Sequence, residues 1–171
     1  METWDAIRAR RNVREFADRP IAAEDLDRIL EAGRRSPSAG NEQRWDFVVV
    51  TDRRRLVELA RVWRGAGHVA TSAATVALLA AVTDDPRTSA LIEFDLGQVT
   101  MSLMVAAADL GVGSGHAAVA DQDLAREILG HPEDRRCAYV IAFGYPAGRP
   151  LAPLKHPDRR PLEEVVHRDH W

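Results

Sequence analysis

Apolar positions recur along the chain at two spacings, one typical of amphipathic helices and one typical of buried strands. A run at helical spacing predicts an amphipathic helix over 22–34, and its apolar positions are Ile21, Leu26, Ile29, Leu30 and Ala32. Further helices are predicted at 4–10, at 53–64, at 89–110, and between the capping residue Asp121 and Gly130. Continuous apolar runs predict three buried strands, at 46–51, 74–83 and 137–145.

Helices and strands mixed in this order indicate an α+β or α/β sandwich. A length of 171 residues lies within the usual range for one compact domain. The chain shows no internal repeat and no low-complexity linker, so we expect a single domain over 1–171.

The long apolar helix at 89–110 is too interrupted for a membrane span, which needs about 20 apolar residues. Its polar interruptions are Glu93, Asp95, Gln98 and Asp109. We therefore expect a buried or interface helix and no membrane partner. The start of the chain lacks the basic and apolar regions of a secretory signal, and the single cysteine, Cys137, excludes an internal disulfide. Both features favour a cytoplasmic location.

Composition and charge narrow the range of possible functions. Hydrophobic residues make up 46% and charged residues 29%, which is ordinary for a soluble globular protein. The net charge of −3 argues against general nucleic-acid binding. Lys155 is the only lysine among 23 basic residues, so any anion site must be built largely from guanidinium groups, which suit phosphate.

Four segments are candidates for chemistry, and each also has a purely structural interpretation. Arg10–Phe16 carries three guanidinium groups that can grip a phosphate, or else forms a solvated helix end. Ser36–Trp45 suits a planar hydrogen-bonding ligand, or is a polar connection. Gly111–Ala118 lets backbone N–H groups approach a ligand, or is a flexible helix-to-strand turn; it follows a helix, so it is no dinucleotide fingerprint. Arg159–Pro161 is a weaker signal.

Taken together, these segments resemble the nitroreductase family of flavoproteins. Arg10–Phe16 resembles the family's opening arginine-arginine-serine-x-arginine-x-phenylalanine. Ser36–Trp45 resembles its proline-serine-x-x-asparagine-x-glutamine-proline-tryptophan signature, and Arg159–Val166 resembles its arginine-rich ending. The resemblance spans nearly the whole chain.

The resemblance implies which residues bind FMN. The phosphate and ribityl chain would be held by Arg10, Arg11, Arg159 and Arg160, and Asn12 would also contact the cofactor. Arg14 would lie near the pyrimidine end of the ring, where a cation stabilises the negative charge of reduced flavin. Ala117 and Ala118 would present a backbone N–H to flavin N5. The loop contacts, partly from the partner subunit, would be Pro37, Ser38 and Asn41.

The same resemblance implies an α+β, three-layer sandwich with a mixed central sheet flanked by helices. It also implies an intertwined homodimer with an exchanged carboxy-terminal arm. The apolar residues of the tail at 146–171 favour such an arm independently, and they are Leu151, Leu154, Leu162, Val165, Val166 and Trp171.

The implied activity is that of an FMN-dependent oxidoreductase. Electrons would pass from NAD(P)H to a nitroaromatic, a quinone or a similar small acceptor by a ping-pong mechanism, with no essential catalytic side chain. Two alternatives stay open: a flavin-dependent dehydrogenase or desaturase that uses oxygen, and a non-enzymatic flavin- or deazaflavin-binding protein.

Departures from the family pattern fall close to the site. Asn12 stands where serine is usual, and Arg44 replaces the signature proline, which loosens the loop and adds a charge. The chain is also short around 63–90, which favours a more open flavin. His116 is the histidine that could lie over the flavin, whereas His167 and His170 make a poor metal site, so no metal is expected.

Overall fold

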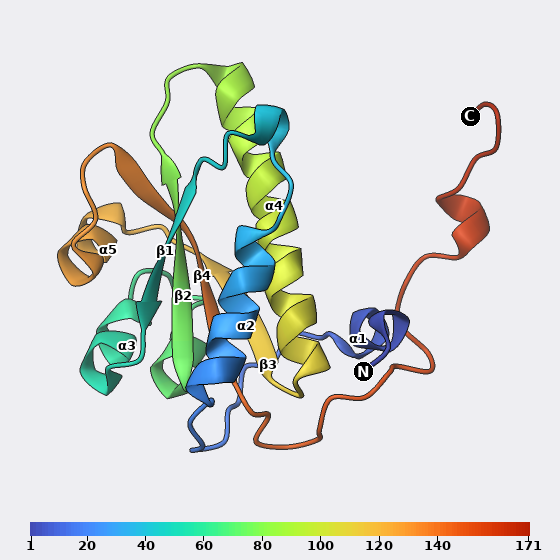
Figure 1. Cartoon of the computed structure of the whole chain (residues 1–171), viewed down its shortest axis with the longest axis horizontal. Helices are drawn as coiled ribbons and strands as arrows, with labels where there is room; N and C mark the ends of the chain where they lie inside the picture. Colours follow the sequence, from blue (N-terminus) through green and yellow to red (C-terminus); the bar gives the residue numbers. More distant parts are fainter.

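Two long apolar strands form the centre of a four-stranded sheet. They are β2 (Ala74–Ala81) and β4 (Arg135–Gly144), and they are flanked by the shorter β1 (Trp45–Val50) and β3 (Gly113–Ala118). The computed structural model describes residues 1–171 and gives the strand order β1-β2-β4-β3 (Figure 1). Every neighbouring pair is antiparallel.

The mixed sheet that the resemblance implied is thereby corrected to an antiparallel one. Strands β2 and β3 run in the same direction, but β4 lies between them and opposes both. Parallel pairing is limited to one isolated bridge, between Asn12 and Ser114.

Helices cover both faces of this sheet, which confirms the three-layer sandwich (Figure 1). One face carries two helices that pack on each other, α2 (Ala23–Arg34) and α4 (Pro86–Asp109). The opposite face carries α3 (Arg53–Leu59), the 3₁₀-helix η2 (Gly67–Thr71) and α5 (Gln122–Leu129). The short α1 (Thr3–Ala9) packs against α4.

Each face of the sheet has its own apolar core. On the α4 side, Ile29, Leu103 and Phe143 are fully buried. On the other side, Leu56 and Val140 are fully buried. Because the two cores cover both faces of the sheet, only its edges remain accessible to a ligand.

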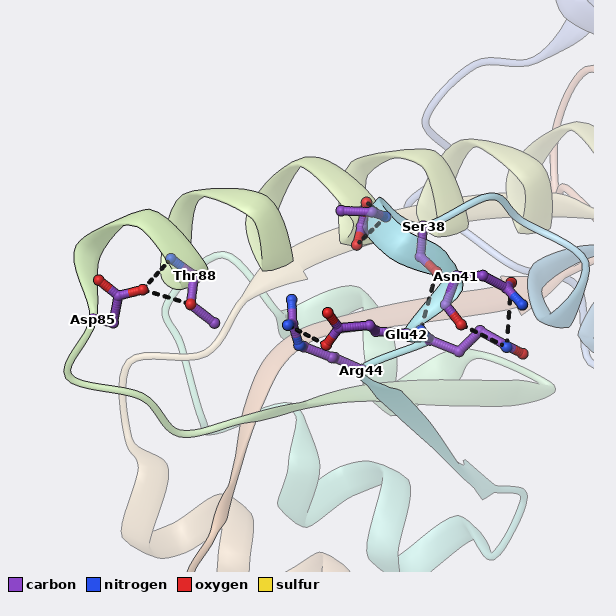
Figure 2. Close-up of polar contacts among 9 residues, drawn as sticks. Ser38, Asn41, Glu42, Arg44, Asp85 and Thr88 are labelled. Carbon is purple, nitrogen blue, oxygen red and sulfur yellow. Dashed lines mark hydrogen bonds and ion pairs between the residues drawn. The ribbon is translucent and has the colours of Figure 1, made fainter.

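Capping residues explain where the helices begin and end. Asp121 accepts a hydrogen bond from Leu124 N–H and Gly130 adopts φ 70°, which confirms the predicted limits of α5. Helix α4 begins at Pro86 rather than at 89, because Asp85 accepts from Thr88 N–H at 2.9 Å (Figure 2). The helix predicted at 53–64 is shorter and ends at Leu59.

The glycine-rich segment Gly111–Ala118 contains a strand, β3, in addition to the three strands that the sequence predicted. The structural interpretation from the sequence had been a flexible turn. Glycine is required there because the chain after α1 lies against this strand. A Cβ on Gly115 would lie 2.4 Å from the carbonyl oxygen of Val13, and one on Gly113 would lie 2.8 Å from the Val13 side chain. The missing side chains therefore permit a close backbone approach, which a count of apolar residues does not reveal.

Helix α4 has two different faces. By length and composition alone it could cross a membrane, a test that core helices of soluble proteins also pass. Its inner face, which includes Ile92, Leu96 and Leu103, is buried in the core. Its outer face leaves Phe94 69% and Met101 41% exposed.

The tail runs away from the body past α1 (Figure 1). Leu151 packs against a core cluster, and Leu154 N–H donates to the carbonyl of Arg8 at 3.2 Å. From His156 to Trp171 every residue is exposed, including the 3₁₀-helix η3 (Leu162–Glu164). The tail thus has apolar residues with no partner in its own chain.

The approach of β3 to Val13 predicts a specific sensitivity. Gly115→Ala should lower the free energy of unfolding by about 1–3 kcal/mol, because a backbone oxygen, which cannot rotate away, occupies the space of the new methyl group. Urea unfolding would measure the loss. Gly67→Ala is the control, since a Cβ there meets no atom within 4 Å, and it should change stability by less than about 0.5 kcal/mol. Equal losses in both variants would contradict this account of β3.

Candidate functional site

The segment that follows α1 is fixed against the edge strand β3. Val13 N–H donates to the carbonyl of Ser114 at 2.8 Å, and Phe16 bridges to Pro146. Val13 and Phe16 are buried and act as apolar anchors. Between the anchors, the polar side chains of this segment are held at the edge of the sheet.

Arg10 lines a cavity of about 360 Å³ between α4 and the β3–β4 edge. The other residues of its lining are Glu93, Gly97, Thr100, Met101, Met104, His116 and Tyr139. The Nε atom of Arg10 is buried and has no hydrogen-bond partner, and no carboxylate pairs with this guanidinium. The positive charge of Arg10 is therefore not compensated by a carboxylate, so the cavity that this residue lines is suited to an anion.

His116 brings a titratable ring to the same cavity. Burial lowers its pKa, and the positive charges of Arg10, Arg14 and His68 lower that pKa further. The ring is therefore neutral at neutral pH. The neighbouring His68 is buried and bonds through Nε2 to the carbonyl of Gly115 at 3.0 Å, which braces β3 from the other side.

A hydrogen-bonded network that includes Glu93 and Tyr139 lines another wall of the cavity of Arg10. Tyr139 O–H donates to Glu93 Oε2 at 2.9 Å, and Arg136 pairs with the other oxygen of Glu93. Burial and the Glu93 carboxylate raise the pKa of Tyr139, so the phenol keeps its proton. The carboxylate of Glu93 is thereby neutralised locally and opposes an incoming anion less.

Arg11 points away from Arg10 and into a different cleft. It donates to the carbonyl of Arg149 and lines a cleft of about 330 Å³ together with Arg14 and Arg149. Burial lowers the pKa of Arg11, and the charge of Arg149 lowers it further. The three arginines predicted to grip one phosphate therefore do not converge on one point within this chain.

The loop at 36–44 lies across α4 in a conformation that few residues adopt (Figure 2). Gly40, Asn41 and Gln43 have φ of 60°, 57° and 49°. Ser38 Oγ accepts from Gln43 N–H at 3.0 Å, and the Asn41 side chain accepts from that of Gln43. Arg44 pairs with Glu42, so the charge that replaces the usual proline is compensated locally.

Helix α4 holds this loop through a buried carboxylate. Asp95 is 2% exposed, and both of its oxygens accept from Ala39 N–H at 3.2 Å. A second link joins Ser36 Oγ to Ser102 Oγ at 2.9 Å. Sequence reasoning treated Asp95 only as an interruption of an apolar helix. The signal was present, because a carboxylate on a buried face requires a hydrogen-bond donor.

Comparisons with known proteins agree with this geometry. A family model described as the nitroreductase family matches residues 7–66 and 60–145. The chain belongs to the nitroreductase family.

Individual relatives extend over the whole chain. A protein of Archaeoglobus fulgidus assigned as an NADH dehydrogenase/NAD(P)H nitroreductase is 32% identical, and the match covers 99% of each chain. The FMN reductase [NAD(P)H] of Bacillus subtilis is 28% identical over 98% of this chain and 74% of its own length. Among solved structures, the NADPH:FMN oxidoreductase of Vibrio harveyi, complexed with NAD⁺, has a TM-score of 0.84 at 23% identity. It covers 97% of this chain and 76% of its own, and shows the same fold.

Part of the nitroreductase motif set gathers at one place in the chain. Arg10, Asn12 and Arg14 lie beside β3, the strand that also carries Ala117 and Ala118. Strand β3 is at the edge of the sheet, so one side of its backbone lacks a strand partner beyond the bridge to Asn12. Their contact with a cofactor stays a prediction.

The rest of the nitroreductase motif set lies elsewhere in a single chain. Pro37 lines a groove on the outer side of α4, and Ser38 and Asn41 bond within their own loop. Arg160 pairs with Glu164, and Arg159 donates to its neighbour's carbonyl in the exposed tail. None of these residues lines the cavity of Arg10.

The Asp95 contact predicts that one buried carboxylate fixes the loop at 36–44. Asp95→Ala should lower the free energy of unfolding by about 1–3 kcal/mol and speed hydrogen exchange at the Ala39 amide, because that N–H loses its acceptor. Asp95→Asn is the matched control: it retains one carbonyl oxygen as acceptor and should show a smaller change in both measurements. If Ala39 stays equally protected in Asp95→Ala, another contact fixes the loop.

Proposed function

We propose that this chain is an NAD(P)H-dependent FMN oxidoreductase. One structural observation carries the proposal: Arg10 lines a cavity beside an edge strand, makes no ion pair, and has a buried Nε without a hydrogen-bond partner. The printed names of the relatives support it, since they include an FMN reductase [NAD(P)H] and an NADPH-flavin oxidoreductase.

The residues at the edge of β3 fit an anionic cofactor. Neither Arg10 nor Arg14 has a carboxylate partner, which leaves both guanidinium groups available to a phosphate or to a negatively charged ring. We assign the FMN phosphate and ribityl chain to Arg10 and Asn12, and the pyrimidine end of the ring to Arg14. Arg159 and Arg160 would complete the phosphate site after the tail is placed by assembly.

Bound FMN would supply the redox chemistry, which is hydride acceptance from a nicotinamide and electron transfer to a second substrate. The protein's own groups would then orient the flavin ring and stabilise its reduced form. A backbone N–H at Ala117 or Ala118 would face N5, and the cation of Arg14 would stabilise negative charge on the reduced ring. The neutral His116 adds no further positive charge at neutral pH.

The nicotinamide and the acceptor would use the same cavity in turn, which is a ping-pong cycle. We propose a small acceptor such as a nitroaromatic or a quinone, and a cytoplasmic enzyme without a nucleic-acid or membrane partner.

A homodimer forms part of this proposal. A groove of about 980 Å³ runs along the outer face of α4 between α1 and α2. Its apolar lining includes Ile7, Phe94, Met101 and Val105, with Phe94 69% exposed. Burying such surface stabilises by roughly 25 cal/mol per Å². A second copy of the chain is the occupant we propose, with Pro37, Ser38 and Asn41 then reaching the partner's cofactor.

The visible spectrum of the purified protein tests the proposed function. We expect bands typical of oxidised flavin that bleach when NADH or NADPH is added without oxygen. Oxidation of a substrate without nicotinamide would instead identify a dehydrogenase or desaturase. Flavin that no nicotinamide reduces would identify a binding protein. A colourless protein that FMN cannot reconstitute contradicts the cofactor assignment.

Because the tail is exposed, we expect its removal to weaken dimer formation without lowering the stability of the single chain. Ending the chain after Lys155 removes only exposed residues, so an isolated chain would keep its stability. If 156–171 embraces a partner, the truncated protein should dissociate at concentrations where the full chain is a dimer, as measured by analytical ultracentrifugation. Removing only 168–171, which keeps Leu162, Val165 and Val166, is the control and should dissociate less. A truncated protein that remains fully dimeric and yellow would refute the arm.

A further inference from the structure

A local irregularity of β4 brings two side chains to one carboxylate in the wall of the cavity of Arg10. Tyr139 O–H donates to Glu93 Oε2 at 2.9 Å, and Arg136 pairs with the other oxygen of the same carboxylate. Glu93 projects from α4, so both of its partners lie on the α4 side of the sheet. In a regular strand, residues three apart point to opposite faces, because successive side chains alternate. Strand β4 therefore departs from regular geometry between Arg136 and Tyr139.

The departure is a β-bulge, in which Ala138 is an extra residue of β4. Cys137 and Tyr139 pair with successive residues of β2, so Ala138 has no pairing partner of its own. The side chain of Gln122 fixes the bulge from α5. Its Nε2 donates to the carbonyl of Cys137 at 2.9 Å, and its Oε1 accepts from the N–H of Cys137 at 3.0 Å. The positions of both partners of Glu93 thus depend on an irregularity that a dedicated side chain holds in place, and bulges often redirect side chains beside binding sites.

This network lies beside the reacting end of the proposed flavin site. Ala118, one of the two residues whose N–H is assigned to flavin N5, pairs directly with Tyr139 across the strands. Directly paired residues share a face of the sheet and have Cβ atoms about 5 Å apart. Asn12, which is assigned to the phosphate end, bridges instead to Ser114, four residues earlier in β3 and therefore about 13 Å along the strand. The network thus lies where a nicotinamide would approach N5, away from the phosphate.

Glu93 and Tyr139 offer a ligand hydrogen-bond acceptors and no free donor. The phenolic proton of Tyr139 is already donated to Glu93, and burial and that carboxylate raise the pKa of the phenol. The phenolic oxygen keeps its lone pairs, and each carboxylate oxygen can accept more than one hydrogen bond. The side chain of Glu93 is 41% exposed, so a ligand can reach these oxygens. A ligand group with N–H donors fits this wall, whereas a methyl group or a carboxylate would leave its acceptors unmatched.

We propose that Glu93 and Tyr139 are specificity-determining residues that accept hydrogen bonds from the carboxamide –NH₂ of the dihydronicotinamide ring. This inference rests on the proposed function, which brings NAD(P)H to the cavity that both residues line. The carboxamide –NH₂ is the one hydrogen-bond donor of that ring, so it is the group that an acceptor wall can recognise. Holding the carboxamide there orients the ring relative to flavin N5. Neither residue is assigned to the flavin itself.

An analogue of NADH in which a methyl group replaces the –NH₂ tests the inference. The analogue is reduced 3-acetylpyridine adenine dinucleotide, and the measurement is the bleaching of the flavin by each donor without oxygen in the full-length protein. The ratio of the two second-order rate constants is compared between variants, which cancels the different intrinsic reactivities of the donors. We expect Glu93→Gln to lower the NADH-to-analogue ratio by about 10-fold, the scale of a hydrogen bond to a charged group. Tyr139→Phe should lower it by about 3-fold, because a neutral phenol is a weaker acceptor.

Arg136→Met is the matched control. It removes the ion pair that links β4 to α4 but leaves both acceptors in place, so it should lower the urea midpoint without a comparable change in the ratio. An unchanged ratio in Glu93→Gln would overturn the inference. An equal fall in Arg136→Met would also overturn it, because the network would then serve only to fasten α4 to β4.

Calorimetry with the oxidised dinucleotides needs no electron transfer. We expect NAD⁺ to bind more tightly than oxidised 3-acetylpyridine adenine dinucleotide, and Glu93→Gln to remove that advantage. Flavin that no nicotinamide reduces would contradict the proposed function, yet the binding advantage would still decide the role of Glu93. An advantage that persists in Glu93→Gln, or no binding of either dinucleotide, overturns the inference.

Discussion

The close approach of the segment after α1 to strand β3 is the constraint on which the candidate site depends. The hydrogen bond from Val13 N–H to the carbonyl of Ser114 is possible only because Gly113 and Gly115 have no side chains. Since an extended chain sends successive side chains to opposite sides, fixing Val13 also fixes where its neighbours point. Arg10 is thereby directed toward α4 and His116, and Arg11 toward the tail.

Helix α4 connects this edge of the sheet to the rest of the molecule. Its inner face fills one core, and Asp95 and Ser102 on the same helix hold the loop at 36–44. Its outer face is apolar and exposed. One element thus supports the stability of the chain, the shape of a motif loop and the surface proposed for assembly, so changes in α4 should affect all three together.

Ion pairs distinguish the arginines that hold the fold together from those that are free to bind an anion. Arg135 and Arg136 pair with carboxylates and link β4 to β1 and to α4. Arg10, Arg11 and Arg14 have no such partner, although carboxylates outnumber basic residues in the whole chain. Unpaired guanidinium groups at one edge of the sheet are the electrostatic basis of the proposed function.

Local sequence signals determined most of the elements and the family motifs. Apolar periodicity and capping residues were enough for α2, α5 and the central strands, because these depend on interactions within a few residues. Asp95 was missed, since the N–H group that it holds lies far away in sequence. Strand β3 was missed because its glycines lack the apolar pattern of a strand. They form one only through pairing with β4 and contact with Val13. Only the tertiary structure decided that the adjacent residues Arg10 and Arg11 line separate cavities. The reason is that the backbone contact of this segment with β3 sets the direction of its side chains.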